Sequence, residues 1–191
     1  MSALFELSEV HRITTEEFRQ LVAGGVLDEN ARVELIDGVV VDMSPRTPAH
    51  EAAVRWLIDW LVAGLDHAQY QHMIGGSMTI GSSEPEPDVA ILDRPAPTQQ
   101  HPSRALLVIE VAVSSRDRDL RSKPAIYAGA VDEYWVIDLE RQELVLHRDG
   151  ADGSYRTIDR VGRGGEATPL ALAMSRLSTE ALFATVLGER D

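Results

Sequence analysis

The sequence predicts an α/β fold formed by a single domain. Short apolar runs typical of buried strands recur through the second half of the chain, and residues 49–65 carry apolar side chains at helical spacing. The 191 residues contain no repeat, low-complexity tract or linker that would mark a domain boundary. We therefore expect residues 1–191 to form one domain, in which residues 1–11 are a tail or edge segment.

Local signals predict helices near both ends of the chain and at two internal positions. Thr14 and Glu17 have the spacing of a capping box, which is followed by apolar residues and a pair of glycines. The helix at residues 49–65 has the most regular apolar face in the sequence. We expect a last helix at residues 178–187 and a more loosely defined one at residues 118–129.

The helix at residues 49–65 carries three side chains with more than one interpretation. Trp56 and Trp60 flank its apolar face, where core packing is favoured over an interface with a partner. His50 stands at the start of the helix and is interpreted as a cap or surface residue rather than a ligand.

An Asp-Gly pair predicts a β-hairpin in the N-terminal third of the chain. Asp37-Gly38 separates two apolar strands at residues 32–36 and 39–43. Glu34 alternates with apolar neighbours, so its side chain points to the opposite face of the strand, toward solvent or a shared cleft. The remaining strand candidates are residues 69–74, 77–80, 89–92, 106–109, 132–138, 143–147 and 154–161, with a turn at Asp149-Gly150 before the last.

Composition and charge restrict the class of protein. The chain has no cysteine, which excludes disulfides and thiolate metal sites, and its formal net charge is −13. This charge opposes binding to DNA, although a local basic surface or a bound metal would reduce the repulsion. The N-terminus lacks the features of a signal peptide, and no apolar stretch approaches the roughly 18 residues of a membrane span. We expect a cytoplasmic protein without a membrane anchor.

Two acids and a lysine stand where buried strands meet polar segments. The apolar run at residues 106–109 leads into Glu110, and a carboxylate there needs a cation, a metal or a hydrogen-bond donor. Lys123 follows thirteen residues later and can share a helix face with Asp119. Asp88 lies at the mouth of another short apolar strand, after a polar, proline-containing approach.

Carboxylates with a nearby lysine indicate a hydrolase that uses a divalent metal. Mg²⁺ and Mn²⁺ prefer oxygen ligands, and a lysine can stabilise charge that develops on a phosphodiester. Spacing alone is weak support for such a site. Judged by spacing alone, the favoured alternative to a metal site is that these acids lie on the surface at strand ends and that the lysine is exposed.

Three segments of the chain resemble a known family. They read VELIDGVVVDMSP, EPDVAILD and LLVIEVAVSSRDRDLRSKPAIYAGAVDEYWVIDLERQELVLHR. Together they resemble the Uma-two family of restriction-endonuclease-like proteins, in the PD-(D/E)XK nuclease superfamily, over residues 12–187. The resemblance implies a mixed central sheet flanked by helices, with the active site where two central strands diverge.

The resemblance also implies a set of site residues. Asp88 matches the first acid of the nuclease motif and would be the main metal ligand, and Glu110 matches the second acid and would be another. The superfamily places its lysine two residues after the second acid, but Ala112 stands there in this chain. In the Uma-two pattern the lysine lies on the following helix, which here is Lys123. Glu34 resembles an additional early acid and would complete the metal shell.

The chain departs from the family pattern at two further points. The family usually has a serine-proline pair after the second acid, where this chain has residues 113–115, and Pro124 follows the lysine and shifts the expected start of the helix. Tyr127, Tyr134 and Trp135 match the aromatic pattern of the family. We expect them to pack in the core, with the alternative that Tyr127 faces the cleft.

The leading functional hypothesis is a DNA endonuclease or phosphodiesterase that depends on Mg²⁺ or Mn²⁺. Its catalytic residues would be Asp88, Glu110 and Lys123, and its metal ligands Asp88, Glu110 and Glu34. The alternative is a catalytically weak module on the same scaffold that binds a protein partner, which the net charge favours. Because restriction-type enzymes often pair to cut two strands, we also expect a homodimer.

Overall fold

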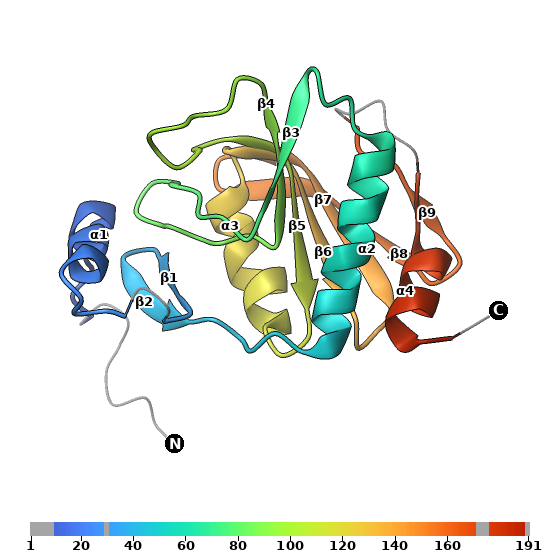
Figure 1. The fold of residues 1–191 in the computed structure, drawn as a ribbon, viewed down its shortest axis with the longest axis horizontal. Coiled ribbons are helices and arrows are strands. Elements are labelled where there is room, and N and C mark those ends of the chain that lie inside the picture. The colour runs from blue at the N-terminus through green and yellow to red at the C-terminus, as the bar shows by residue number, and fades with distance from the viewer. Residues whose placement is uncertain (1–9, 29–30, 171–175, 190–191) are drawn as a thin grey trace.

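A six-stranded sheet forms the centre of the structure, which is a computed structural model and describes residues 10–28, 31–170 and 176–189 (Figure 1). In sheet order the strands are β3 (Tyr70–Ile74), β4 (Val89–Asp93), β5 (Ala105–Ala112), β6 (Val131–Asp138), β7 (Glu143–Ala151) and β8 (Ser154–Gly162). The central pair, β5 and β6, is parallel, and the other neighbouring pairs are antiparallel. The predicted α/β fold with a mixed sheet is therefore confirmed.

Helices α2 (Pro48–Gly64) and α4 (Thr179–Leu187) cover one face of the sheet (Figure 1). Alternate strand residues such as Ile109 point to this face and form one hydrophobic core with the two helices. Trp60 stacks on Trp135 there, with ring centroids 6.4 Å apart. The favoured core role is therefore confirmed for Trp60, and Trp56 also packs against this core.

The opposite face of the sheet is covered by α3 (Lys123–Tyr127) and the π-helical turn before it, η2 (Arg118–Ser122). Val108 and Tyr127 belong to a second hydrophobic core on this side. Glu110 lies two residues after Val108 in the same strand, so it points to the same face. The alternation of side chains along β5 thus places the acid under η2 and α3.

The N-terminal segment forms a small unit beside the sheet (Figure 1). It contains α1 (Thr15–Ala23), which begins with the predicted capping box, and the hairpin of β1 (Val33–Ile36) and β2 (Val39–Asp42). Backbone hydrogen bonds of 3.4 and 2.7 Å join Leu35 to Glu84, in the segment that leads into β4. This docking brings the neighbouring Glu34 to the main sheet.

Two of the strand and turn predictions are wrong. Residues 77–80 form no strand, because the amides of Met78 and Thr79 donate to the carbonyls of Pro85 and Pro102 in neighbouring loops. Met78 is buried in the second core, which explains the apolar signal. The predicted turn at Asp149-Gly150 lies inside β7. The chain turns instead at Asp152-Gly153, where both residues have the positive φ that a two-residue hairpin turn requires.

Two boundaries near the predicted site also differ from expectation. Glu110 does not end its strand, since β5 continues to Ala112. The helix expected at residues 118–129 begins as a π turn and ends at Tyr127. Pro124 explains the turn, because proline has no N–H and its ring clashes with the carbonyl four residues earlier in a regular helix. The amide of Lys123 donates instead to the carbonyl of Arg118, five residues back.

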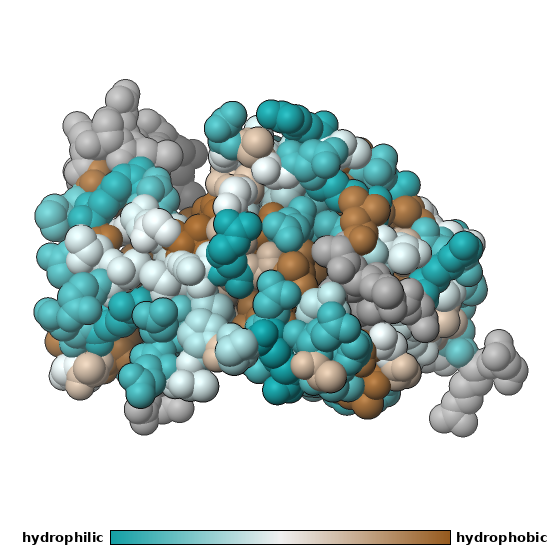
Figure 2. Space-filling view, turned by 90° about the horizontal axis from the view of Figure 1, so that it is seen from above, coloured by the Kyte–Doolittle hydropathy of each residue, from teal (hydrophilic) through white to brown (hydrophobic). Residues whose placement is uncertain are grey.

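Short elements complete the described chain. β9 (Glu166–Ala167) and β10 (Leu177–Ser178) pair beside the main sheet, and Ser178 caps α4. Residues 1–9 of the expected tail lie outside the described residues. Among the described helices, none is long and apolar enough to cross a membrane. The face shown in Figure 2 is largely hydrophilic, with hydrophobic residues in small separate groups.

Candidate active site

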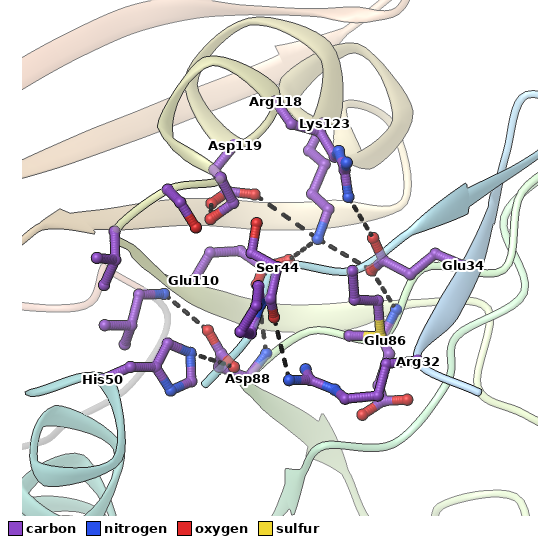
Figure 3. A pocket seen from close by; sticks show the side chains of 16 residues that line it. Arg32, Glu34, Ser44, His50, Glu86, Asp88, Glu110, Arg118, Asp119 and Lys123 are labelled. Carbon is purple, nitrogen blue, oxygen red and sulfur yellow. Dashed lines mark hydrogen bonds and ion pairs between the residues drawn. The ribbon is translucent and has the colours of Figure 1, made fainter. Parts of the chain in front are cut away.

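The structure places all four residues of the predicted site around one pocket (Figure 3). Glu34 comes from β1, Asp88 directly precedes β4, Glu110 comes from β5, and Lys123 begins α3. The pocket therefore lies where the N-terminal hairpin, the central strands and the helix after β5 meet. Each of these elements forms for local reasons, but only their packing brings the four side chains together.

Lys123 lies at the centre of the acidic side chains. Its Nζ is 2.8 Å from Oε1 of Glu110, 3.0 Å from Oε1 of Glu34 and 3.7 Å from Oδ1 of Asp119. Burial would lower the pKa of the Lys123 ammonium, but the carboxylates outweigh burial and raise this pKa above its ordinary value. Lys123 is therefore held as a cation, and it is the only lysine in the sequence.

Glu110 is buried beneath the lysine. Its Oε1 accepts hydrogen bonds from Lys123 and from the Tyr127 hydroxyl, at 2.8 and 3.1 Å, and its Oε2 accepts a 3.4 Å bond from the Asp88 amide. Burial raises the pKa of Glu110 well above its ordinary value, Lys123 opposes this shift, and the neighbouring acids add to it. Burial also raises the pKa of Tyr127, so its hydroxyl keeps its proton and donates to Glu110. Tyr127 thus faces the site while its ring packs in the core.

Asp88 is the most accessible of the predicted acids. Its side chain is 13% exposed, compared with 5% for Glu110 and 1% for Glu34. Its Oδ2 accepts a 2.8 Å hydrogen bond from the amide of Val111 in β5, and its Oδ1 lies 3.0 Å from Nε2 of His50. The expectation that His50 is a cap or surface residue is wrong: Thr47 caps α2, and the imidazole contacts Asp88.

Glu34 has partners on both carboxylate oxygens. Oε1 accepts hydrogen bonds from Lys123 and from the amide of Glu86, at 3.0 and 2.9 Å. Oε2 lies 3.8 Å from Nη1 of Arg118, and the same nitrogen donates to the Asp42 carbonyl at 2.8 Å. These contacts tie the hairpin to the helical segment above the sheet.

Asp119 is an acid of the site that the predicted set did not contain. It is buried, accepts a hydrogen bond from the Ser115 hydroxyl, and its backbone carbonyl accepts one from Tyr134. Burial raises the pKa of the Asp119 carboxyl, and Lys123 opposes this shift. The spacing of four residues between Asp119 and Lys123 was a sequence signal for this contact. No comparable spacing connects His50 with Asp88 in the sequence.

The charged residues that line the pocket are net acidic. They comprise five carboxylates against two arginines and one lysine, and the arginines are Arg32 and Arg118. Arg46 lies nearby, 3.3 Å from Glu86. The site therefore lacks a uniformly basic rim, and its excess of two negative charges equals the charge of one divalent cation.

Only part of the donor set in the pocket fits a metal ion. Within residues 10–28, 31–170 and 176–189, no group of three or more His, Cys, Asp or Glu side chains is arranged to hold one. Asp88 and Glu110 nevertheless adjoin each other, and Mg²⁺ is often bound by one or two carboxylates together with waters and substrate phosphate. The oxygen donors of these two residues fit such a site. Glu34 fits it less well, because two cations, Lys123 and Arg118, already lie beside its oxygens and its side chain is only 1% exposed.

Comparisons with known proteins agree with this fold. Residues 15–180 match the Uma2 family, which is described as "Putative restriction endonuclease". The structure is also similar to a crystal structure described as a putative nuclease belonging to DUF820 from Anabaena variabilis ATCC 29413. The TM-score is 0.71 and the identity 14%, over 91% of this chain and 99% of that chain. No curated protein matches the chain. Because the family match covers most of its length, the chain belongs to the Uma2 family.

Proposed function

We propose that this protein is a nuclease that hydrolyses phosphodiester bonds in DNA with the help of Mg²⁺ or Mn²⁺. One observation carries the proposal: a buried lysine lies within 3.0 Å of two carboxylates, with the more accessible Asp88 beside them. Membership of a family described as "Putative restriction endonuclease" supports this interpretation. The proposed metal ligands are Asp88 and Glu110.

The proposed roles follow from the contacts of each side chain. A bound divalent ion would supply an acidified water and polarise the phosphodiester. Lys123, which stays protonated because its pKa is raised, would stabilise the charge that develops on the phosphate rather than accept a proton. Asp88 would present its accessible oxygens to the ion, and the amide of Val111 would hold its carboxylate in place.

We assign Glu34 a different role from that of a main ligand. Its two oxygens engage Lys123 and the amide of Glu86 on one side and Arg118 on the other. In the proposed enzyme, Glu34 would hold the lysine in position and fix the hairpin against the site. Metal binding would then depend mainly on Asp88 and Glu110.

The acidic balance of the pocket supports a second candidate function. Duplex DNA normally binds to a basic surface, and the lining of this pocket is net acidic before any cation binds. A protein of this fold without nuclease activity would instead be an interaction module for a protein partner. The two candidates differ in whether the site binds a divalent ion.

The proposal is tested by titrating Mn²⁺ calorimetrically and following plasmid nicking in the same low-salt buffer. Asp88→Asn and Glu110→Gln keep the shape of the side chains but remove their charge. We expect each variant to lose metal binding and to nick at least about a hundredfold more slowly, because loss of a ligand should cost no less than loss of a partner of a ligand, which costs up to about a hundredfold.

Asp59→Asn is the matched control, because Asp59 is exposed on α2 and lies outside the pocket lining. This variant should bind Mn²⁺ and nick DNA like the wild type. Nicking by Asp88→Asn at the wild-type rate would refute the assignment of the site. A wild type that binds no Mn²⁺ at millimolar concentration and leaves DNA intact would favour the interaction module.

A further inference from the structure

The start of α2 brings a histidine into the candidate site. Thr47 caps the helix by accepting a 3.2 Å hydrogen bond from the amide of His50, and Pro48 occupies the first helical position. These local features fix the backbone of His50 at the third residue of the helix. Its imidazole is largely buried and points to Asp88 (Figure 3).

The two nitrogens of this imidazole have different surroundings. Nε2 lies 3.0 Å from Oδ1 of Asp88, whereas Nδ1 is buried and has no hydrogen-bond partner among the described residues. A proton on Nδ1 would be a buried donor without an acceptor, which is unfavourable. The tautomer that fits this site therefore carries its proton on Nε2 and donates it to Asp88.

This hydrogen bond completes the support of the Asp88 carboxylate. Oδ1 faces the histidine and Oδ2 accepts from the amide of Val111, so the carboxylate is held from α2 on one side and from β5 on the other. A carboxylate offers about four lone-pair positions, and these two bonds leave one on each oxygen. The remaining positions are available to a cation beside Glu110.

We propose that His50 is a positioning residue that fixes Asp88 for metal binding through its Nε2–H. This inference rests on the proposed function, in which Asp88 is a metal ligand. His50 acts through Asp88 rather than on the substrate. Partners of metal ligands commonly contribute about 10- to 100-fold to metal affinity or activity.

The test compares three substitutions of His50 by calorimetric titration with Mn²⁺. The amide nitrogen of glutamine reaches about as far as Nε2 of histidine, whereas that of asparagine corresponds to Nδ1. We therefore expect His50→Asn and His50→Ala to weaken Mn²⁺ binding about 10- to 100-fold. His50→Gln should restore most of the affinity, because it restores a donor to Oδ1 of Asp88.

A second measurement requires neither metal nor activity. Nitrogen-15 NMR of the imidazole in the metal-free protein should show the Nε2–H tautomer of His50, and the resonance of this proton should move in Asp88→Asn. An Nδ1–H tautomer would overturn the proposed hydrogen bond. Wild-type Mn²⁺ affinity in His50→Asn, or a His50→Gln variant as impaired as His50→Ala, would overturn the positioning role.

The outcomes also separate this inference from the proposed function. A wild type that binds Mn²⁺ and nicks DNA, together with unimpaired His50 variants, overturns only the role of His50. A wild type that binds no Mn²⁺ overturns the proposed function and the positioning role with it, even where NMR finds the hydrogen bond.

Discussion

At the scale of single residues, the main feature of the site is an excess of buried acid around one lysine. Glu110, Glu34 and Asp119 all lie within 4 Å of the Lys123 ammonium. One cation cannot neutralise three carboxylates, and burial makes each remaining charge costly. The raised pKa values of Glu110 and Asp119 express this cost. Such a cluster lowers the stability of the fold, and binding of an additional cation would relieve the repulsion between its carboxylates.

We predict that Glu110→Gln stabilises the protein at neutral pH. The folded-state pKa of Glu110 is raised above its ordinary value of 4.5. The contribution of Glu110 to the free energy of unfolding is therefore fully present below pH 4.5 and is lost as the pH rises through the folded-state pKa. The variant should therefore be more stable than the wild type at pH values above the folded-state pKa, where the wild type buries a charged carboxylate. Lys123 keeps Glu34 and Asp119 as counter-charges in the variant.

Urea unfolding at pH 4.5 and pH 8 measures this effect, and the advantage of Glu110→Gln should grow with pH. The matched control is Glu51→Gln, at an exposed position on α2, which should stay within about 0.5 kcal/mol of the wild type. A variant less stable than the wild type at pH 8 would show that the ion pair with Lys123 outweighs the burial of the charge.

At the scale of elements, the π turn η2 determines where the lysine lies. Because Pro124 prevents a regular helix at this point, the chain makes one wide turn before α3 begins. A residue added to or removed from a helical turn rotates the following side chains by about 100°. The wide turn therefore sets the direction of the Lys123 side chain relative to the strand that carries Glu110.

We predict that Pro124→Ala impairs activity and also destabilises the fold at neutral pH. Alanine restores a backbone donor and favours the regular helix, which would turn Lys123 away from Glu110 and Glu34. Unfolding in urea at neutral pH should show lower stability, because buried Glu110 and Glu34 lose their counter-charge, and plasmid nicking should fall. The control is Pro97→Ala, in an exposed loop outside the site pocket, which should not change nicking. Full activity in Pro124→Ala would mean that the π turn does not orient the lysine.

At the scale of the whole molecule, the distribution of charge limits how DNA would bind. The formal net charge of −13 repels a polyanion, so attraction would come only from a few arginines near the pocket. Arg32 and Arg118 line the pocket, and Arg46 lies beside it with a half-exposed side chain. Binding through so few cations should be weak and only moderately dependent on salt.

We predict a shallow salt dependence of DNA affinity. In a plot of the logarithm of affinity against the logarithm of salt concentration, each phosphate contact contributes about −0.9 to the slope, so the three arginines should give a slope no steeper than about −3. Arg46→Gln should reduce the size of this slope by about 0.9. The matched control Arg104→Gln should leave it unchanged, because Arg104 is exposed and lies outside the site pocket. The slope is measured by fluorescence anisotropy of a short labelled duplex, titrated with the protein at several salt concentrations in the presence of Ca²⁺. An unchanged slope in Arg46→Gln would exclude Arg46 from phosphate binding.

Most of the elements and their order follow from local signals in the sequence. The capping box before α1, the apolar face of α2 and the apolar runs of β4, β5 and β6 are local signals, so each was predicted within a few residues. Local signals did not locate the turn between β7 and β8, because two neighbouring segments have the same turn sequence. The two Asp-Gly pairs near residue 150 are equivalent as turn sequences, and only the pairing of β7 with β8 selected the second.

The assembly of the site depends on contacts between segments that are far apart in the sequence. Lys123 meets Glu34 from 89 residues away in the sequence, and His50 reaches Asp88 from the start of α2. Family resemblance pointed to Asp88, Glu110, Lys123 and Glu34, but no local pattern indicated that a histidine on a helix would contact Asp88. These contacts depend on the docking of the hairpin and on the packing of α2 against the sheet. Contacts of this range arise from packing, which local propensity and periodicity do not encode.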